Sequence, residues 1–104
     1  MAGDNLESWR VGVLFSQTGV TAGIERTQLN ATLLAISEIN AGGGVLGRPV
    51  EPVIYDPGSD PKKFRGFAER LFQLDRIRLL FGCYMSSTRK AVLPVVEGHR
   101  GLLF

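Results

Sequence analysis

The sequence predicts an α/β fold with a parallel sheet, built in the order βαβαβαβ. Short apolar runs alternate with longer stretches of helical periodicity along the chain. The apolar runs are nearly continuous, as is typical of strands buried on both faces of a parallel sheet. Glycine and proline lie where one kind of element gives way to the next. Together these observations predict one domain in which helices cross over between parallel strands.

The first half of the chain is predicted to hold a strand and a long helix. Residues 1–9 are polar and are expected to be disordered or frayed, so the domain covers 10–104. A buried strand is predicted over 10–16 and a helix over 22–41. The glycines at 42–44 are expected to end this helix, since glycine accepts a left-handed conformation. The predicted apolar face of the helix consists of Ile24, Leu29, Leu33, Ile36 and Ile39.

A second strand and a second helix follow. The strand is predicted over 50–56, and Pro52 within it cannot donate a ladder hydrogen bond, which indicates an edge position. Asp60 is the expected N-cap of the helix, with Pro61 at its first position. The helix has the clearest apolar stripe of the chain, consisting of Phe64, Phe67, Ala68, Leu71 and Phe72.

The third strand is predicted over 77–81 and the third helix from 87 to about 98, where Pro94 is expected to kink the helix or loosen its first turns. A fourth strand is expected to begin at Gly101. Placing the second strand outermost gives the spatial order 2-1-3-4. In this order the loops after strands 1 and 3 flank a switch-point crevice, where open α/β sheets bind ligands.

The end of the sequence falls inside the predicted fourth strand. This leaves a strand edge and part of an apolar face uncovered, and such an edge invites pairing with another chain. We therefore expect either the N-terminal portion of a longer protein or a piece that associates with itself or with a partner.

Composition excludes several classes of function. The net charge is +2 and the twelve Lys and Arg residues are scattered, which argues against direct nucleic-acid binding. No apolar run approaches the roughly 20 residues of a membrane span, so no membrane insertion is expected. The N-terminus lacks the pattern of a signal peptide. The expected location is cytoplasmic, or periplasmic if a signal peptide has been removed.

The candidate reactive residues do not predict an enzyme. Cys83 and His99 are the sole cysteine and histidine, so neither an intramolecular disulfide nor a metal site is expected. Ser86 or Cys83 would be the nucleophile, with His99 as the base. A helix of about 12 residues separates Ser86 from His99 by roughly 18 Å, which makes the pair implausible. Cys83 is expected to pack as a small hydrophobe, and His99 to be solvated at a helix end.

Three other segments have weaker signals. The glycine-rich run at 42–47 precedes a strand, whereas a phosphate loop follows one, so a helix cap explains it better. Residues 16–19 follow a strand without matching a nucleotide motif, and Ser16 in that segment either lines a ligand or belongs to a plain turn. Asp56 and Asp60 could hold a cation, although turn and cap roles explain them better.

The most informative segment is 82–90, with the sequence GCYMSSTRK, between the third strand and the third helix. Hydroxyls at a helix start either cap the helix or share its free N–H groups with a ligand. In the first interpretation Ser86 or Ser87 only caps the helix. In the second, Tyr84 is a flat wall and a serine hydroxyl binds a small polar ligand. The residues alone leave both open.

Four segments resemble the type 1 periplasmic binding proteins: GVLFSQTGVTAGIER at 12–26, GGGVLGRP at 42–49, DPGSDP at 56–61 and GCYMSSTRKAVLPVVE at 82–97. The similarity covers about 10–104 and is most detailed to AmiC-like amide-sensing regulators and to the amide- and urea-binding proteins of ABC transporters. It implies two lobes that close on a small ligand without chemistry or a cofactor. The chain would be the N-terminal portion of lobe 1, an incomplete flavodoxin-like lobe.

The resemblance also implies site residues. In AmiC-like proteins the tyrosine and serine of the CYMS motif contact a short aliphatic amide, which corresponds to Tyr84 and Ser86 here. Ser87 stands where these relatives have histidine. The family's next ligand-contacting segment, a Tyr-Pro-Thr loop, would follow Phe104, so weak ligand affinity is expected of this chain alone.

Three functions follow from this resemblance. The first is an AmiC-like negative regulator of amidase expression, which senses small aliphatic amides or urea and acts on an antiterminator partner. The alternative is the substrate-binding component of an amide, urea or branched-chain amino acid ABC transporter, which meets a membrane permease. A third is an isolated lobe fragment that self-associates through exposed sheet edges.

Overall fold

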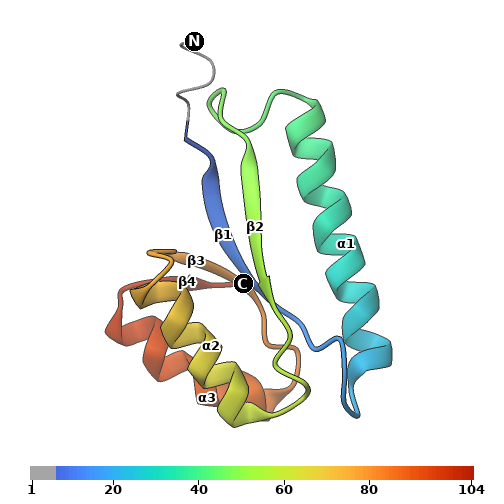
Figure 1. The fold of residues 1–104 in the computed structure, drawn as a ribbon, viewed down its shortest axis with the longest axis vertical. Helices are drawn as coiled ribbons and strands as arrows, with labels where there is room; N and C mark the ends of the chain where they lie inside the picture. Colours follow the sequence, from blue (N-terminus) through green and yellow to red (C-terminus); the bar gives the residue numbers. More distant parts are fainter. Residues whose placement is uncertain (1–6) are drawn as a thin grey trace.

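The computed structural model describes residues 7–104, in which four parallel strands form one sheet. Their order in the sheet is β2-β1-β3-β4, as the sequence predicted (Figure 1). The strands are β1 (Trp9–Leu14), β2 (Val50–Tyr55), β3 (Leu79–Gly82) and β4 (Leu102–Leu103). The helices are α1 (Ala22–Ala41), α2 (Pro61–Gln73) and α3 (Ser86–Gly98). Pro52 lies in β2 at the sheet edge, where its missing N–H breaks no ladder.

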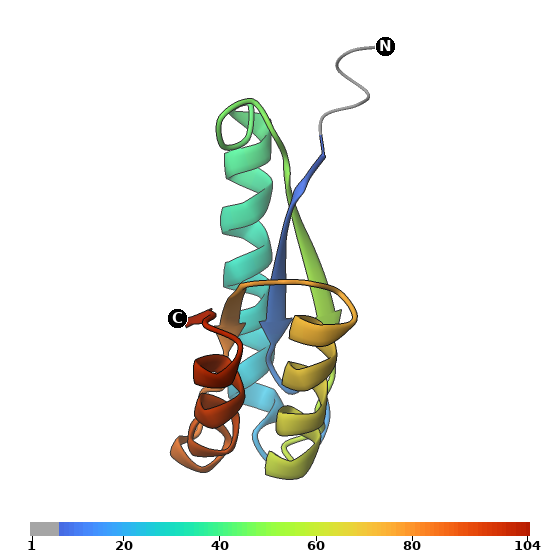
Figure 2. The same ribbon diagram turned by 90° about the vertical axis from the view of Figure 1, so that its left-hand side faces the viewer.

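Helices cover the sheet from both sides, α1 on one face and α2 with α3 on the other (Figures 1 and 2). The larger core cluster lies under α2 and α3 and includes Leu14, Phe64, Leu71, Leu80 and Val92. The smaller cluster lies under α1 and consists of Val11, Val13, Phe15, Leu29 and Ile36. The alternation of side chains along β1 explains this division, because neighbouring residues point to opposite faces.

Helix α1 has the predicted bounds, but a narrower buried face than predicted. Leu29 and Ile36 are buried, whereas Ile24 and Ile39 are exposed, since only one side of the helix meets the sheet. Its end is built by glycine as expected. Gly43 has φ of 105°, and the N–H of Gly44 donates to Ile39 O at 2.9 Å, as in a Schellman motif.

Helix α2 confirms its predicted start. The side chain of Asp60 accepts a hydrogen bond from the Lys62 N–H at 2.9 Å, and Pro61 occupies the first turn. Four of the five stripe residues are buried and Phe67 packs beside them. The apolar stripe predicted which face of α2 is buried, because a 3.6-residue period places all five stripe residues on one side of the helix.

Three boundaries differ from prediction at the third β–α unit: β3 starts later and ends one residue later, at Gly82, and α3 starts one residue earlier. β3 begins at Leu79 rather than at 77, because Arg76 adopts a left-handed φ of 55° and turns the chain. Ile77 is still buried, as a loop residue in the core. Helix α3 begins at Ser86 and continues through Pro94 to Gly98.

The structure describes only part of the segment 1–9 that was predicted to be disordered or frayed. Positions 1–6 lie outside the described part of the chain. β1, however, begins at Trp9, one residue earlier than predicted, and ends at Leu14. The indole Nε1 of Trp9 donates to Val45 O at 2.7 Å, and the Arg48 guanidinium lies 3.5 Å from the ring centroid. These contacts extend the strand into the segment that was expected to fray.

The pairing of β1 is unequal on its two sides. β2 pairs with all six residues of β1, from Trp9 to Leu14, but β3 pairs only from Gly12 to Leu14. At the far side β4 leaves Leu102 and Phe104 mostly exposed, at 61% and 69%. In the described part of the chain, no helix is long and apolar enough to cross a membrane.

Candidate ligand-binding site

The edge at which the sequence predicts a crevice is where β1 and β3 end side by side. Gly82 has φ of 134°, and a Cβ there would lie 2.1 Å from Leu14 O, so no larger residue fits this close approach. Cys83 follows with φ of 63°, and its N–H donates to Leu14 O at 3.0 Å. These two left-handed residues turn the chain out of the sheet and present the next three side chains at its edge.

Tyr84, Ser86 and Ser87 are all exposed at this edge, and 47% of Tyr84 is accessible. The first interpretation of this segment, in which Ser86 or Ser87 only caps α3, is wrong. The N-cap is Met85, and the helix start has no side-chain cap hydrogen bond. Instead the Thr88 hydroxyl donates back to Met85 O at 2.8 Å. Within residues 7–104, neither serine hydroxyl is therefore engaged at the helix start.

The first backbone N–H groups of α3 also have no hydrogen-bond partner within the helix. The Arg89 N–H makes the first helical hydrogen bond, to Met85 O at 2.9 Å, so the three preceding N–H groups have no partner within the helix. They carry the positive end of the helix dipole. An acceptor such as a carboxylate or an amide carbonyl fits this position.

Ser16, the other predicted site residue, is fully buried. Its N–H donates to Glu25 Oε1 at 2.8 Å, and its hydroxyl accepts from the Ser59 N–H at 2.8 Å. Both polar groups are thus engaged within the fold. The structure brings Tyr84, Ser86 and Ser87 together but places Ser16 beneath the surface.

Glu25, in the first turn of α1, is a charged residue that is completely buried. Its second carboxylate oxygen accepts the Thr21 hydroxyl, and Thr21 Oγ1 lies 2.8 Å from Ser59 Oγ. The network joins the loop after β1 to the loop after β2. The sequence signal was an acidic residue in the first helical turn, where the dipole favours it.

Asp56 makes a second set of ties at the same edge. Its carboxylate accepts from the Gln17 N–H at 2.8 Å, the Thr18 hydroxyl at 2.9 Å and the Gly58 N–H at 3.0 Å. Burial acts to raise the pKa of Asp56, but these hydrogen bonds together hold it below its ordinary value of 3.8. The turn role is confirmed. Across residues 7–104 no group of three or more metal-ligating side chains is found.

Cys83 and His99 do not form a reactive pair. Burial raises the pKa of the Cys83 thiol to about 12, and the charge of Glu25 adds to the effect, so the thiol packs as the predicted hydrophobe. His99 stacks on Phe72 at a centroid distance of 5.4 Å, rather than standing free in solvent. It caps the far end of α3 from Ser86. Within residues 7–104, this edge of the sheet therefore holds no nucleophile with a base beside it.

Comparison with known proteins agrees with this fold. The family model described as periplasmic binding protein domain matches residues 9–104. A leucine-, isoleucine-, valine-, threonine- and alanine-binding protein of Pseudomonas aeruginosa is 32% identical over 103 residues, covering 99% of this chain and 26% of that protein. A Leu/Ile/Val-binding protein of Escherichia coli is 28% identical over 91 residues, covering 88% of this chain and 24% of its own length.

Solved structures of other proteins also match this fold. The branched-chain amino acid transporter substrate-binding protein of Streptococcus pneumoniae, in complex with isoleucine, superposes with a TM-score of 0.90 at 23% identity, covering 92% of this chain and 28% of that one. An ABC transporter substrate-binding protein from Sphaerobacter thermophilus gives 0.84 at 27% identity, covering 93% and 25%. The chain thus spans about a quarter of the length of the relatives it matches. The match of the family model over almost the whole chain places it in the periplasmic binding protein domain family.

Proposed function

We propose that this chain is the N-terminal portion of the first lobe of a solute-binding protein, and that a small ligand meets it at Tyr84, Ser86 and Ser87. The observation that carries the proposal is the uncapped start of α3 beside the exposed ring of Tyr84. Free N–H groups and hydroxyls hold a polar head, while the ring packs against an aliphatic part. Binding is without chemistry, in keeping with relatives that are named as binding proteins.

The ligand class that the relatives support is a branched-chain amino acid, delivered to an ABC transporter. Two curated relatives are named for binding leucine, isoleucine and valine. In this proposal the α-carboxylate accepts from the N–H groups at the start of α3, and the negative charge is favoured by the helix dipole. The partner is a membrane permease and the location is the periplasm.

A second candidate is a small aliphatic amide or urea, bound by an AmiC-like sensor that acts on an antiterminator partner in the cytoplasm. The CYMS segment at 83–86 favours it, because the resemblance to such regulators implies ligand contact by Tyr84 and Ser86, and both are exposed here. A neutral carbonyl would replace the carboxylate at the same N–H groups. The two candidates therefore differ in ligand charge rather than in the position of the site.

Titrations with isoleucine, acetamide and urea distinguish these candidates. Calorimetry on a chain that extends through both lobes should show binding of one ligand class, and Ser86→Ala should weaken it by about fivefold, the effect of one hydrogen bond. Ser37→Ala, at an exposed position of α1, is the matched control. Binding of none of the three ligands, or an equal loss in both variants, would contradict the site.

The same titrations followed by NMR on the 104-residue chain test how much of the site is present. We expect weak binding, with amide shifts confined to residues 84–88, because one wall supplies only one or two hydrogen bonds. Affinity equal to that of the longer chain would show that this wall is the whole site.

A further inference from the structure

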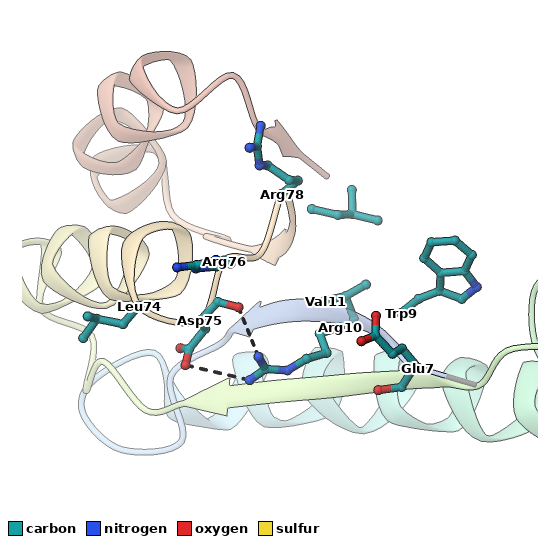
Figure 3. A pocket seen from close by; sticks show the side chains of 10 residues that line it. Glu7, Trp9, Arg10, Val11, Leu74, Asp75, Arg76 and Arg78 are labelled. Carbon is teal, nitrogen blue, oxygen red and sulfur yellow. Dashed lines mark hydrogen bonds and ion pairs between the residues drawn. The ribbon is translucent and has the colours of Figure 1, made fainter. Parts of the chain in front are cut away.

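A groove lies at the opposite edge of the sheet, where the strands begin. It has a volume of about 890 Å³ and runs between the start of β1 and the loop before β3. Figure 3 shows Trp9 at one end and Leu74 at the other, with Arg10, Arg76 and Arg78 around it. We propose that this groove binds an acidic peptide segment in extended conformation, added as a strand beside the open half of β1.

The backbone of β1 supplies the first argument. The Trp9 N–H donates toward β2, to Pro49 O at 2.7 Å. Since successive residues of a strand direct their N–H and C=O groups to alternate sides, those of Arg10 point toward the groove. β3 pairs with β1 only from Gly12 onward, so Arg10 has no ladder partner on this side. An extended peptide would pair there, as in recognition by strand addition.

The charge of the groove supplies the second argument. Arg10 is engaged with Asp75, whose carbonyl oxygen accepts Nη1 at 3.1 Å and whose carboxylate lies 3.8 Å from Nη2 (Figure 3). The Tyr55 hydroxyl also donates to that carboxylate, at 2.9 Å. Glu7 also lines the groove (Figure 3), and its carboxylate lies 3.9 Å from the Arg48 guanidinium. Among residues 7–104, Arg76 and Arg78 form no ion pair, and both side chains are exposed.

A peptide is the occupant that satisfies both arguments. Two unpaired guanidinium groups favour carboxylates, which arginine binds through paired hydrogen bonds. The exposed side chain of Leu74 and the ring of Trp9 offer apolar contact at the two ends. Acidic side chains that alternate with apolar ones would therefore match the groove, since alternate residues of a strand point to opposite sides.

A blocked pentapeptide with the sequence Asp-Val-Asp-Val-Asp tests this proposal. Trp9 is the sole tryptophan of the chain, so its fluorescence reports binding at the groove directly. We expect a saturable change in emission that weakens with added salt. We expect about tenfold weaker binding for Asn-Val-Asn-Val-Asn, which keeps the backbone but loses the charges. No change in Trp9 emission with the acidic peptide would overturn the proposal.

Two matched variants separate the groove from the general charge of the protein. Arg76→Ala with Arg78→Ala should weaken the acidic peptide about tenfold, the effect of two exposed ion pairs. Lys62→Ala with Lys63→Ala removes the same charge from the start of α2 and should leave the affinity unchanged. An equal loss in both double variants would contradict a site in the groove.

A last probe tests the strand pairing itself. The peptide methylated on the nitrogen of its central residue cannot donate that backbone hydrogen bond, and should bind about fivefold more weakly. Undiminished affinity would overturn strand addition. Three other results would each overturn the peptide in favour of another occupant. Tight binding of vesicles rich in phosphatidylglycerol would indicate a membrane surface, and dimers lost in the double arginine variant would indicate a second copy of the chain. Stronger peptide binding once residues 1–6 are removed would indicate that this N-terminal segment competes for the groove.

Discussion

The two edges of the sheet are built in opposite ways. At the edge where the strands end, the carboxylates of Glu25 and Asp56 tie neighbouring loops together through backbone and hydroxyl donors. At the edge where the strands begin, Arg76 and Arg78 lie over an open groove. At the first edge these polar groups hold the loops after β1 and β2 in place. The second edge leaves the side chains of Arg76 and Arg78 without ion pairs among residues 7–104. We expect these side chains to contribute little to the stability of the fold.

The largest effect that separates the edges is expected from Gly82→Ala. A methyl group there meets the Leu14 carbonyl oxygen at 2.1 Å, at a φ of 134°. We expect a loss of at least about 3 kcal/mol in the free energy of unfolding, from backbone strain and displacement. Chemical denaturation measures it. Gly66→Ala in α2, where a Cβ has open space, should instead stabilise by about 0.5–1 kcal/mol. Equal results for the two glycines would refute the close approach.

Glu25→Gln tests the buried network. The amide keeps one acceptor but loses the charge that strengthens both hydrogen bonds, so we expect a loss of about 2 kcal/mol in stability. The same change removes a negative charge near Cys83, so the pKa of its thiol should fall from about 12. Ultraviolet titration of the thiolate gives that readout. Glu38→Gln, on the exposed side of α1, should change neither quantity.

Asp60→Ala should have a smaller effect. It removes the acceptor of the Lys62 N–H at the start of α2, and loss of such a cap lowers stability by about 1 kcal/mol. Asp60→Asn retains an acceptor and should restore most of this loss. Denaturation midpoints of the three proteins compare them, and an alanine variant as stable as the parent would mean that Pro61 alone sets the helix start.

Acid should weaken the edge where the strands end through Asp56. Because the pKa of Asp56 is lower in the folded state than its ordinary value of 3.8, its contribution to stability is complete above that value. The contribution is lost as the pH falls through the folded-state pKa. Asp56→Asn should therefore flatten the decline in stability below about pH 4. A decline as steep in the variant would assign the acid sensitivity to other carboxylates.

The smallest effect is expected at the opposite edge. Arg76→Ala with Arg78→Ala should leave the free energy of unfolding within about 0.5 kcal/mol of the parent, because exposed side chains without ion pairs contribute little. Thermal and chemical denaturation check this. A large loss would erase the contrast between the edges, since the arginines would then support the fold.

The topology was predictable because its signals are local. The stripe of α2, the glycines after α1 and the proline of β2 each act through backbone or periodicity, and each was confirmed. Tertiary relations were not predictable. Ser16 is an ordinary polar residue in sequence, and only the approach of Ser59 and Glu25 from other elements commits its hydrogen bonds. Ser86 resembled a cap, but the N-cap position falls on Met85.

The groove was likewise hidden from the sequence. Its arginines lie in separate segments, near the starts of β1 and β3, and nothing in their spacing predicts that they meet. The left-handed turn at Arg76 brings them together, because it delays β3 until Leu79. The scattered positions of the basic residues in the sequence therefore did not predict that these arginines lie together in the structure.

The unequal pairing of β1 has a consequence for hydrogen exchange. Gly12 to Leu14 lie between two strands and under helices on both faces, whereas Trp9 to Val11 are paired with β2 alone. Amides that depend on a single neighbouring strand open by local fluctuation, and those in the centre open only with the whole domain. Within β1, the amides of Trp9 to Val11 should therefore exchange through local opening. Those of Gly12 to Leu14 should exchange only on global unfolding, so their protection measures the stability of the whole domain.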